Sequence, residues 1–387
     1  MSLGDMRICS PHCGVAPETT SGGETYEREL LARLGRAGVD VDLILARGKP
    51  HPEGVPHWTV HRFPMRRGLR WWVAPFIVPS AIKRVWDERP FDLLRVHSLR
   101  YIGPSALIAR RRFNLNVPVV SHHHHLDPSP LNRLIEKRVV EASDRVVVGS
   151  EFGRRQLAAE LGVRTDHVSV VYYGVDPAFV PGPLAPDLLD RYRLRGHPVV
   201  LFLGGLKPRK NLFLLLDVWA PVAARVPEAR LVIAGGGPLR ADLERHARRL
   251  GLEARVVFTG YVPEAEKAAH FRLADVFLFP SAMEGFGFSV AEAMSAGVPV
   301  VASDRGSIPE LVAEGQSGFV CDPSVPERFV ERLLLLLGDV ALREKFGAVG
   351  RERADRLFRW EACVDGTRRV YEETLSAWRR RGARPAP

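Results

Sequence analysis

The stretch Pro280-Ser-Ala-Met-Glu-Gly-Phe-Gly-Phe-Ser-Val-Ala-Glu-Ala-Met-Ser-Ala-Gly-Val-Pro-Val-Val-Ala-Ser-Asp304 decides how this chain folds. Apolar runs at 276–279 and 298–302 flank its centre, and each is typical of a buried strand. Between them a helix is expected to begin at Ser289, which would cap the first turn with Glu292 three residues later, and to end at Gly297. A helix that crosses between two such strands predicts a parallel α/β arrangement.

A glycine turn, Gly285-Phe286-Gly287, stands directly before this helix. The free N–H groups and the positive end of the helix dipole at such a place attract anions, and phosphate is the obvious candidate. Two acids bracket the turn. Glu284 is a glycine-flanked acid on a loop, where a carboxylate has little structural use. Glu292 is ambiguous, because its spacing alone favours the return arm of a capping box with Ser289.

The composition is that of a globular protein with two domains. The 387 residues suit two domains of about 150 to 200 residues, and 46% of them are hydrophobic. The sequence contains no charge-free apolar run of about 18 residues, and we expect no N-terminal signal peptide. Four cysteines without framework spacing favour a reducing cytoplasm. The net charge of +10 favours anionic partners, which include sugar nucleotides, nucleic acid and lipid surfaces.

Strand and helix patterns alternate along both halves of the chain. They predict an N-terminal α/β domain over 1–180, a proline-rich linker over 181–195 and a second α/β domain over 196–360. A last amphipathic helix and a basic tail, 361–387, follow, and we expect this helix to pack back toward the N-terminal domain. Cys9, His12 and Cys13 resemble a partial metal-ligand set, but no second cluster completes it, so we expect no metal site.

Residues 62–84 combine basic and aromatic side chains without an acid. This mixture suits an anionic membrane surface, although nucleic acid would use a similar one. The alternative is a core-facing helix pair with a solvated basic side. The side chains in question are Arg62, Arg66, Arg67, Arg70, Trp71, Trp72, Phe76, Ile77, Lys83 and Arg84.

Three further places at predicted strand ends are candidates for binding. Gly22-Gly23 stands where the first helix begins, and four histidines, 122–125, follow a strand at 117–120. Ligands of open α/β sheets bind outside the carboxyl ends of strands, so one of these histidines is expected to face a cleft. The loop 204–211 carries two glycines and the cations Lys207, Arg209 and Lys210, which suits a diphosphate. It is neither a P-loop nor a dinucleotide-binding motif.

Taken together, these motifs resemble the retaining GT-B glycosyltransferases of glycosyltransferase family 4. The resemblance covers nearly the whole chain. It includes Gly22-Gly23, Val171-Tyr-Tyr-Gly-Val-Asp176, Pro208-Arg-Lys-Asn211, Ala234-Gly-Gly-Gly-Pro238, Gly260-Tyr-Val262 and the stretch from Pro280 to Glu310. It implies a GT-B fold, with two Rossmann-like domains facing each other across a cleft. It also implies a hexosyl-type glycosyltransferase that uses a UDP- or GDP-sugar as co-substrate and needs no cofactor.

The resemblance also implies roles for single residues. Glu284 would accept hydrogen bonds from sugar hydroxyls, and Glu292 would bind the ribose. Arg209 and Lys210 would neutralise the diphosphate. His124 would support the sugar and its oxocarbenium-like charge through its main-chain carbonyl as well as its ring, and a slip of one residue would replace it by His123. Lys210, Glu284 and His124 would form the catalytic group. The donor-binding set is completed by main-chain groups: Gly22, Gly23, Val262, Gly285, Phe286, Gly287, Phe288 and Ser289.

The expected reaction is a metal-independent transfer that retains the anomeric configuration. No Asp-x-Asp motif lies in a suitable loop, and no carboxylate pair for a double displacement is evident. The acceptor would be a glycan, a lipid-linked compound or a small molecule, and nucleic acid is not an expected partner. The enzyme would be cytoplasmic and peripheral at the membrane. One departure is Gly205, where many family members carry arginine.

Two alternatives stay open from the sequence. One is a sugar-nucleotide epimerase or a phosphorylase on the same fold. The other is a non-catalytic subunit that binds sugar nucleotides or membrane, which Gly205 favours.

Overall fold

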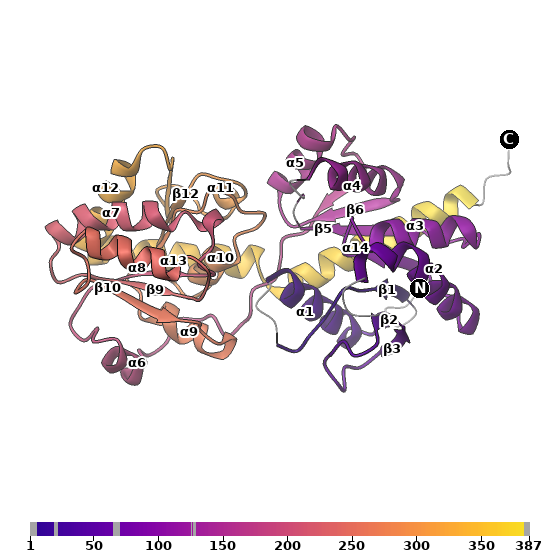
Figure 1. Ribbon diagram of the computed structural model, residues 1–387, viewed down its shortest axis with the longest axis horizontal. Helices are drawn as coiled ribbons and strands as arrows, with labels where there is room; N and C mark the ends of the chain where they lie inside the picture. The colour runs from indigo at the N-terminus through magenta and orange to yellow at the C-terminus, as the bar shows by residue number, and fades with distance from the viewer. Residues whose placement is uncertain (1–5, 19–21, 65–69, 125, 127–128, 383–387) are drawn as a thin grey trace. The chain divides into compact units, whose positions relative to one another are not determined.

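The computed structural model describes residues 6–18, 22–64, 70–124, 126 and 129–382. The chain forms two compact units (Figure 1). The N-terminal unit consists of Met1–Gly174 together with Trp360–Pro387, and the C-terminal unit is Val175–Arg359. The segment predicted as a linker contains helix α6 (Pro186–Arg191), whose Leu188 is buried in the C-terminal unit. The domain boundaries expected from the sequence stay predictions.

The N-terminal unit is built on a seven-stranded sheet in which every strand pair is parallel, in the order β3-β2-β1-β4-β5-β6-β7. Its strands are β1 (Arg7–Pro11), β2 (Asp40–Ala46), β3 (Trp58–Phe63), β4 (Leu93–Val96), β5 (Val119–His123), β6 (Arg145–Val148) and β7 (Val168–Val170). Its helices are α1 (Gly22–Arg36), α2 (Arg70–Glu88), α3 (Ile102–Arg112), α4 (Pro130–Ala142), α5 (Glu151–Leu161) and α14 (Trp360–Gly382).

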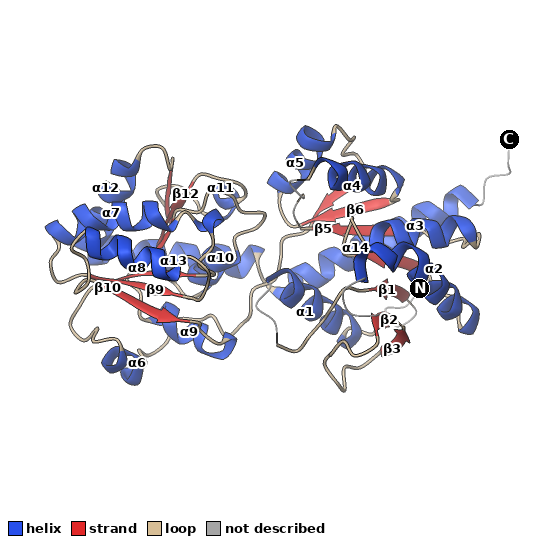
Figure 2. Ribbon diagram, in the orientation of Figure 1, coloured by secondary structure: helices blue, strands red, loops and turns tan. Residues whose placement is uncertain are grey.

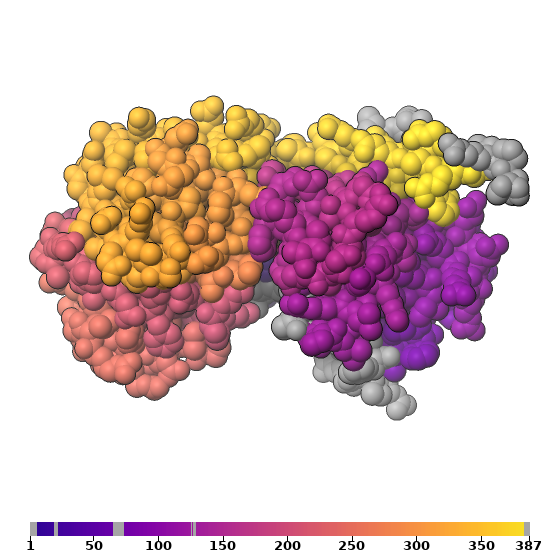
Figure 3. Space-filling model, turned by 90° about the horizontal axis from the view of Figure 1, so that it is seen from above, coloured from indigo at the N-terminus to yellow at the C-terminus, as the bar shows by residue number. Residues whose placement is uncertain are grey.

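Alternating residues of the strands divide the core of this unit between the two faces of the sheet. Cys9, Ile44 and Leu94 face the apolar sides of α2 and α3. Their neighbours along the strands point to the opposite face, because side chains alternate along a strand. That second face is packed by α1 and by α14, whose outer side lies at the surface in Figure 3 (yellow). Helix α14 therefore contributes to the N-terminal unit, although it comes last in the chain.

The C-terminal unit repeats this plan with a six-stranded parallel sheet, in the order β10-β9-β8-β11-β12-β13. Its strands are β8 (Val199–Leu203), β9 (Arg230–Ala234), β10 (Val256–Gly260), β11 (Val276–Phe279), β12 (Val300–Ser303) and β13 (Gly318–Cys321). Helices alternate with the strands (Figure 2). They are α7 (Leu212–Arg225), α8 (Arg240–Arg249), α9 (Glu264–Arg272), α10 (Phe288–Ser295), α11 (Ile308–Leu311), α12 (Pro326–Gly338) and α13 (Val340–Leu357), with a 3₁₀ turn η1 (Pro208–Lys210).

Both sheets reverse their strand order at one point. In the N-terminal unit this switch lies between β1 and β4, and in the C-terminal unit between β8 and β11. At such a point the loops of neighbouring strands leave the sheet in opposite directions, and ligands of open α/β sheets bind there, outside the carboxyl ends of the strands. The cationic loop 204–211 follows β8 and the loop of Glu284 follows β11, so the topology brings these two predicted segments together.

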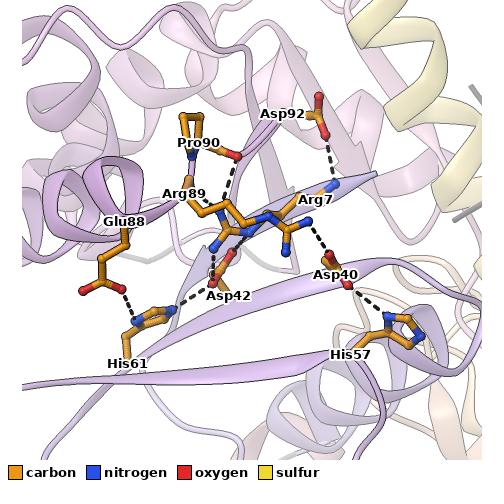
Figure 4. A network of polar contacts seen from close by, with 9 residues as sticks. All are labelled: Arg7, Asp40, Asp42, His57, His61, Glu88, Arg89, Pro90 and Asp92. Carbon is orange, nitrogen blue, oxygen red and sulfur yellow. Dashed lines mark hydrogen bonds and ion pairs between the residues drawn. The ribbon is translucent and has the colours of Figure 1, made fainter. Parts of the chain in front are cut away.

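The amino edge of the N-terminal sheet carries a polar network of another kind (Figure 4). Arg7, on β1, pairs with the buried carboxylate of Asp42 on β2 at 2.7 Å, and its main-chain N–H donates to Asp92 at 2.9 Å. His61, on β3, lies 2.8 Å from Asp42. These bonds join β1, β2 and β3 to the start of β4, at the edge opposite to the carboxyl ends of the strands.

No helix in the described ranges is long and apolar enough to cross a membrane. The basic segment 62–84 is described in part, since Arg66 and Arg67 lie outside those ranges. Arg62 donates to the main-chain carbonyls of Ala46 and Lys49 at 3.2 and 2.7 Å, which ties it to the fold. On α2, Phe76 is 79% exposed.

Candidate active site

The carboxylate of Glu284 is the centre of a cluster at the switch point of the C-terminal unit. Lys210 donates from Nζ to Oε1 at 2.7 Å, and Ser281 donates to the same oxygen at 2.7 Å. The Arg209 guanidinium lies 2.8 Å from Oε2 and also donates to the main-chain carbonyl of Met283 at 2.8 Å. The predicted residues Arg209, Lys210 and Glu284 are therefore in direct contact.

Burial and charge act in opposite directions on this cluster. Burial alone would raise the pKa of Glu284, but the charges of Lys210 and Arg209 outweigh it and hold that pKa below its ordinary value. Burial lowers the pKa of Lys210, and Glu284 opposes this effect. The ammonium also lies 4.5 Å above the ring of Phe279, a cation–π contact. Because the carboxylate stays ionised, the cluster keeps both signs of charge side by side.

The main chain of Glu284 is held by the turn after β12. Ser307 donates from its N–H and its hydroxyl to the Glu284 carbonyl, at 3.0 and 3.2 Å. Gly306 has a φ of +68°, and a Cβ at this position would lie 2.1 Å from the same carbonyl oxygen. A side chain at 306 would therefore displace the backbone that carries the carboxylate.

Helix α10 begins differently from the prediction. Its N-cap is Gly287, which has a φ of +92°, and no side chain caps the first turn. The prediction that Ser289 caps this helix is wrong, because Ser289 is already the second helical residue. Left-handed Gly287 turns the chain instead, and a Cβ there would lie 2.8 Å from Ile308. Phe286 packs inward against Phe358, so it can meet a ligand through its main chain.

Glu292 is buried on α10 without taking part in a cap. Since Ser289 does not cap the helix, the capping-box interpretation of Glu292 fails. Its Oε2 has no hydrogen-bond partner among the residues that the structure describes. Burial raises the pKa of Glu292 to about 7, although the ammonium of Lys267 on α9 acts against this shift. An unpartnered buried carboxyl group is costly, so a ligand hydroxyl there would satisfy an orphaned acceptor.

Glycines bring the neighbouring loops into contact at the same edge. The Gly235 N–H donates to the Gly260 carbonyl at 2.8 Å, and a Cβ on Gly235 would lie 2.0 Å from the Gly204 carbonyl. Val262, in the loop after β10, is buried, with 6% of its surface exposed. The preceding Tyr261 is 64% exposed.

In the N-terminal unit, the predicted residues lie at the carboxyl edge of the sheet. Gly22 and Gly23 are the first two residues of α1. His123 is buried within β5, and His124 follows the strand and is half-buried. The His124 ring lies 2.9 Å from the carboxylate of Glu27 through Nε2 and 2.6 Å from the Tyr173 hydroxyl through Nδ1. The fourth histidine of the run, His125, lies outside the described residues.

Comparison with known proteins identifies the family. The model described as "Glycosyltransferase Family 4" matches residues 20–179, and "Glycosyl transferases group 1" matches residues 191–353. The GDP-mannose-dependent alpha-(1-6)-phosphatidylinositol monomannoside mannosyltransferase of Mycolicibacterium smegmatis is 33% identical over 325 residues, which are 80% of this chain and 82% of that protein. The chain belongs to glycosyltransferase family 4. It is an enzyme of the glycosyltransferase class, as the sequence predicts.

Further comparisons support the same family and the fold. The D-inositol 3-phosphate glycosyltransferase of Segniliparus rotundus is 33% identical to this glycosyltransferase, over an alignment that includes 95% of this chain and 87% of that protein. Among solved structures, sucrose-phosphate synthase from Thermosynechococcus elongatus superposes with a TM-score of 0.80, at 23% identity over 96% of this chain and 100% of that one. A UDP complex of Anabaena HepE gives 0.78, at 21% identity over the same shares. The predicted GT-B fold is confirmed.

The structure of the glycosyltransferase reveals polar residues that the sequence analysis missed. Glu27 is 1% exposed, and its Oε2 lies 2.6 Å from the guanidinium of Arg95 on β4, which is fully buried. The sequence does indicate that both residues are buried, because each is a charged residue at a position where the pattern predicts an apolar one. Glu27 stands three, four and seven residues before Leu30, Leu31 and Leu34, so it falls on the apolar face of α1. Arg95 interrupts the buried strand Leu-Leu-Arg-Val.

His12, Glu27 and His97 also lie close enough together to be considered as metal ligands. Two features of the glycosyltransferase argue against this use. The His12 and His97 rings stack face to face at 3.5 Å with 6° between their planes, so their in-plane lone pairs run parallel and do not converge on one ion. The Glu27 oxygen on that side is already paired with Arg95. The cluster is better suited to a fixed hydrogen-bond network.

Proposed function

We propose that this glycosyltransferase transfers a hexosyl group from a nucleoside diphosphate sugar to an acceptor hydroxyl, with retention of configuration and without a metal ion. The observation that carries the proposal is the convergence of Lys210, Arg209 and Ser281 on the Glu284 carboxylate, beside the N-terminus of α10. Cations, an acid and free helix N–H groups at the switch point suit a molecule that joins a sugar to a diphosphate.

Glu284 can accept a hydrogen bond from the transferred sugar while its present contacts persist. A carboxylate offers about four lone-pair positions. Two of them, on Oε1, are used by Lys210 and Ser281, and Arg209 occupies one on Oε2. The remaining position on Oε2 is available to a sugar hydroxyl, and the surrounding cations keep the acceptor ionised.

Lys210 and Arg209 neutralise the diphosphate as it leaves. Each has donors beyond those given to Glu284, and the N-terminus of α10 adds partial positive charge. Gly205, which stands where many family members carry arginine, exposes no side chain. In this proposal Lys207 takes the place of that arginine. Its side-chain Cε lies 3.7 Å from the position of a Cβ on Gly205, and Lys207 is exposed.

The nucleoside is held on the other side of the same edge. Glu292 supplies its unpartnered Oε2 to the ribose hydroxyls, and the main chain at Val262 faces the base. Main-chain groups from Gly285 to Ser289, together with Gly22 and Gly23 of the N-terminal unit, complete the set. His124 supports the transferred sugar. Lys210, Arg209 and the N-terminus of α10 stabilise the negative charge of the leaving diphosphate, so its departure needs no metal ion. The acceptor hydroxyl attacks the sugar from the face that the diphosphate leaves, and the leaving phosphate accepts the proton of that hydroxyl.

The names of relatives suggest which substrates to test first. The M. smegmatis relative is named for GDP-mannose, and it and the S. rotundus relative are both named for inositol-containing acceptors. We therefore propose GDP-mannose as the first donor and an inositol-bearing compound as the first acceptor, with UDP-glucose in parallel. A cytoplasmic location remains part of the proposal.

The central experiment combines donor binding with a residue test. A thermal-shift screen of GDP- and UDP-sugars identifies the donor, because a bound ligand raises the melting temperature according to its affinity. Transfer is then measured with Glu284→Ala and with Glu327→Ala, a control that removes an exposed acid from α12. We expect Glu284→Ala to abolish transfer and the control to retain it. Near-normal turnover of Glu284→Ala would contradict the site.

Product analysis separates the finer claims and the alternatives. Retention is read from the anomeric configuration of the product by NMR, and an inverted product would contradict it. Activity that is lost with EDTA and restored by a divalent ion would contradict metal independence. Release of a nucleoside diphosphate excludes an epimerase or a phosphorylase, and any turnover excludes a non-catalytic subunit.

Membrane binding through residues 62–84 is a second proposal, favoured by the exposed Phe76 on helix α2. Vesicles of anionic phospholipid should sediment the protein at low salt and release it as salt rises. Phe76→Ser should weaken sedimentation, with Ile108→Ser on α3 as the control. Binding that does not respond to salt, or no binding, would contradict the proposal.

A further inference from the structure

Glu27 places a buried charge directly against the histidine that the proposed function uses. Its side chain is 2% exposed and comes from α1, 97 residues before His124 in the chain. One carboxylate oxygen lies 2.9 Å from Nε2 of His124. The other lies 2.6 Å from the Arg95 guanidinium and 3.4 Å from Nε2 of His12. Arg95 outweighs the effect of burial and holds the pKa of Glu27 well below its ordinary value, so the carboxylate is ionised.

The proton positions around His124 follow from its two neighbours. An ionised carboxylate can only accept, so Nε2 of His124 carries a hydrogen and donates it to Glu27. Burial raises the pKa of Tyr173 well above its ordinary value, so its hydroxyl keeps its proton. That hydroxyl donates to Nδ1 of His124 at 2.6 Å, a shorter contact than the 3.4 Å to the His123 carbonyl. Both ring nitrogens are therefore engaged inside the N-terminal unit.

The main-chain carbonyl of His124 differs from the ring in its hydrogen bonding. The residue lies just past the end of β5, and no hydrogen bond to its carbonyl oxygen is present within the described residues. A carbonyl oxygen at the carboxyl end of a central strand is a group that can stabilise positive charge on a bound molecule. The ring anchors the residue, and the carbonyl is the part left for a ligand.

We propose that Glu27 is a positioning residue, which holds the His124 ring through Nε2 and thereby fixes the His124 main chain, the group that the resemblance to the family assigns to the transferred sugar. This inference rests on the proposed function, in which His124 acts on that sugar. Its new element is the assignment of the two ring nitrogens of His124 to Glu27 and Tyr173. Arg95 keeps Glu27 charged, and its own Nε donates to the Tyr371 hydroxyl of α14 at 2.9 Å.

A purely structural role is the competing explanation, since Glu27 also neutralises the buried Arg95. Removing Glu27 alone would leave that cation unpaired and could unfold the protein. The double variant Glu27→Met/Arg95→Met removes both charges at similar volume and avoids this problem. The matched control is Arg7→Met/Asp42→Asn, which removes another buried arginine–carboxylate pair of the same sheet, at its amino edge (Figure 4).

Steady-state kinetics distinguish the two explanations. If Glu27 positions His124, the Glu27→Met/Arg95→Met variant should lose about 10- to 100-fold in kcat with little change in the donor KM, because a small misplacement of a reacting group has that effect. The Arg7→Met/Asp42→Asn control should lower the melting temperature by a comparable amount and keep its kcat. Equal kcat values in the two folded variants would overturn the inference.

A second measurement does not depend on activity. In protein labelled with ¹⁵N-histidine, the His124 signals, assigned with a His124→Asn variant, should be those of a ring protonated at Nε2. The Nε2 signal should move in Glu27→Met/Arg95→Met and stay in place in Arg7→Met/Asp42→Asn. An unmoved signal would overturn the inference even if the wild-type protein transferred no sugar, whereas inactivity of the wild type with a moved signal would contradict only the proposed function.

Discussion

The contact between Gly306 and Glu284 leads to a prediction that a matched pair of variants can test. In Gly306→Ala the new Cβ would lie 2.1 Å from the Glu284 carbonyl oxygen, whereas real Cβ atoms stay at least 3.0 Å from their neighbours. The carbonyl must therefore move by about 0.9 Å, which breaks its bonds from Ser307. Gly315 has a φ of +67°, against +68° at Gly306, and a Cβ there meets nothing within 4 Å. Gly315→Ala therefore isolates the effect of left-handed backbone.

The expected magnitudes differ because only one variant moves the carboxylate. A left-handed alanine costs about 1–2 kcal/mol, which is the full expected loss for Gly315→Ala. Gly306→Ala adds about 1–3 kcal/mol for the overpacked contact. Displacing the Glu284 backbone by almost 1 Å should also reduce kcat/KM about 100-fold.

Urea unfolding and steady-state transfer assays measure these two quantities. We expect Gly315→Ala to keep its kcat/KM and Gly306→Ala to lose it while still folded. If both variants had the same stability and the same kcat/KM, the turn after β12 would not position Glu284, and the reasoning would be refuted.

Three other predictions concern the same edge of the C-terminal sheet. The pKa of Glu292 is about 7 in the folded protein, against 4.5 in the unfolded chain, so the free energy of unfolding of the wild type falls as pH rises through this window. Glu292→Gln should therefore be more stable than wild type by up to about 3 kcal/mol at pH 8 and about equally stable near pH 4.5. Urea unfolding at several pH values measures this difference. Lys207→Ala should raise the donor KM about 10-fold and leave the affinity for a nucleoside monophosphate unchanged. If calorimetry showed that the affinities for the donor and for the monophosphate fall equally, a contact of Lys207 with the diphosphate would be contradicted. Lys210→Met should lower kcat about 100- to 1000-fold, and an unchanged kcat would remove this residue from the stabilisation of the leaving group.

Local sequence predicted the elements whose signal is apolar and continuous. Strand β11 of the C-terminal unit agrees with the predicted run at 276–279, because a strand buried on both faces can be uninterrupted in Val, Leu and Phe. The edge strand β3, Trp58–Phe63, was not predicted, since most of its residues are half-exposed and its pattern is mixed.

The start of α10 shows where local rules fail. Ser289 followed by Glu292 satisfies the capping-box pattern, yet the helix begins at Phe288 after a left-handed Gly287. Packing decides this position, because Phe286 fits against Phe358 and the turn of Gly287 fits against Ile308. Neither Phe358 nor Ile308 is near in sequence, so a capping rule that considers four residues could not include them.

The sequence by itself determined the family, the α/β class and the residues of the candidate site in the C-terminal unit, because these depend on motifs and on the order of strands along the chain. Arg209, Lys210 and Glu284 are in contact since the two loops leave neighbouring central strands in a parallel sheet. Only the tertiary structure decided how His124 is held. Its partners Glu27 and Tyr173 lie 97 and 49 residues away, and their contact depends on how α1 and the end of the N-terminal sheet pack together. Burial, which no short motif records, then makes each of these polar groups depend on the others for a hydrogen-bond partner.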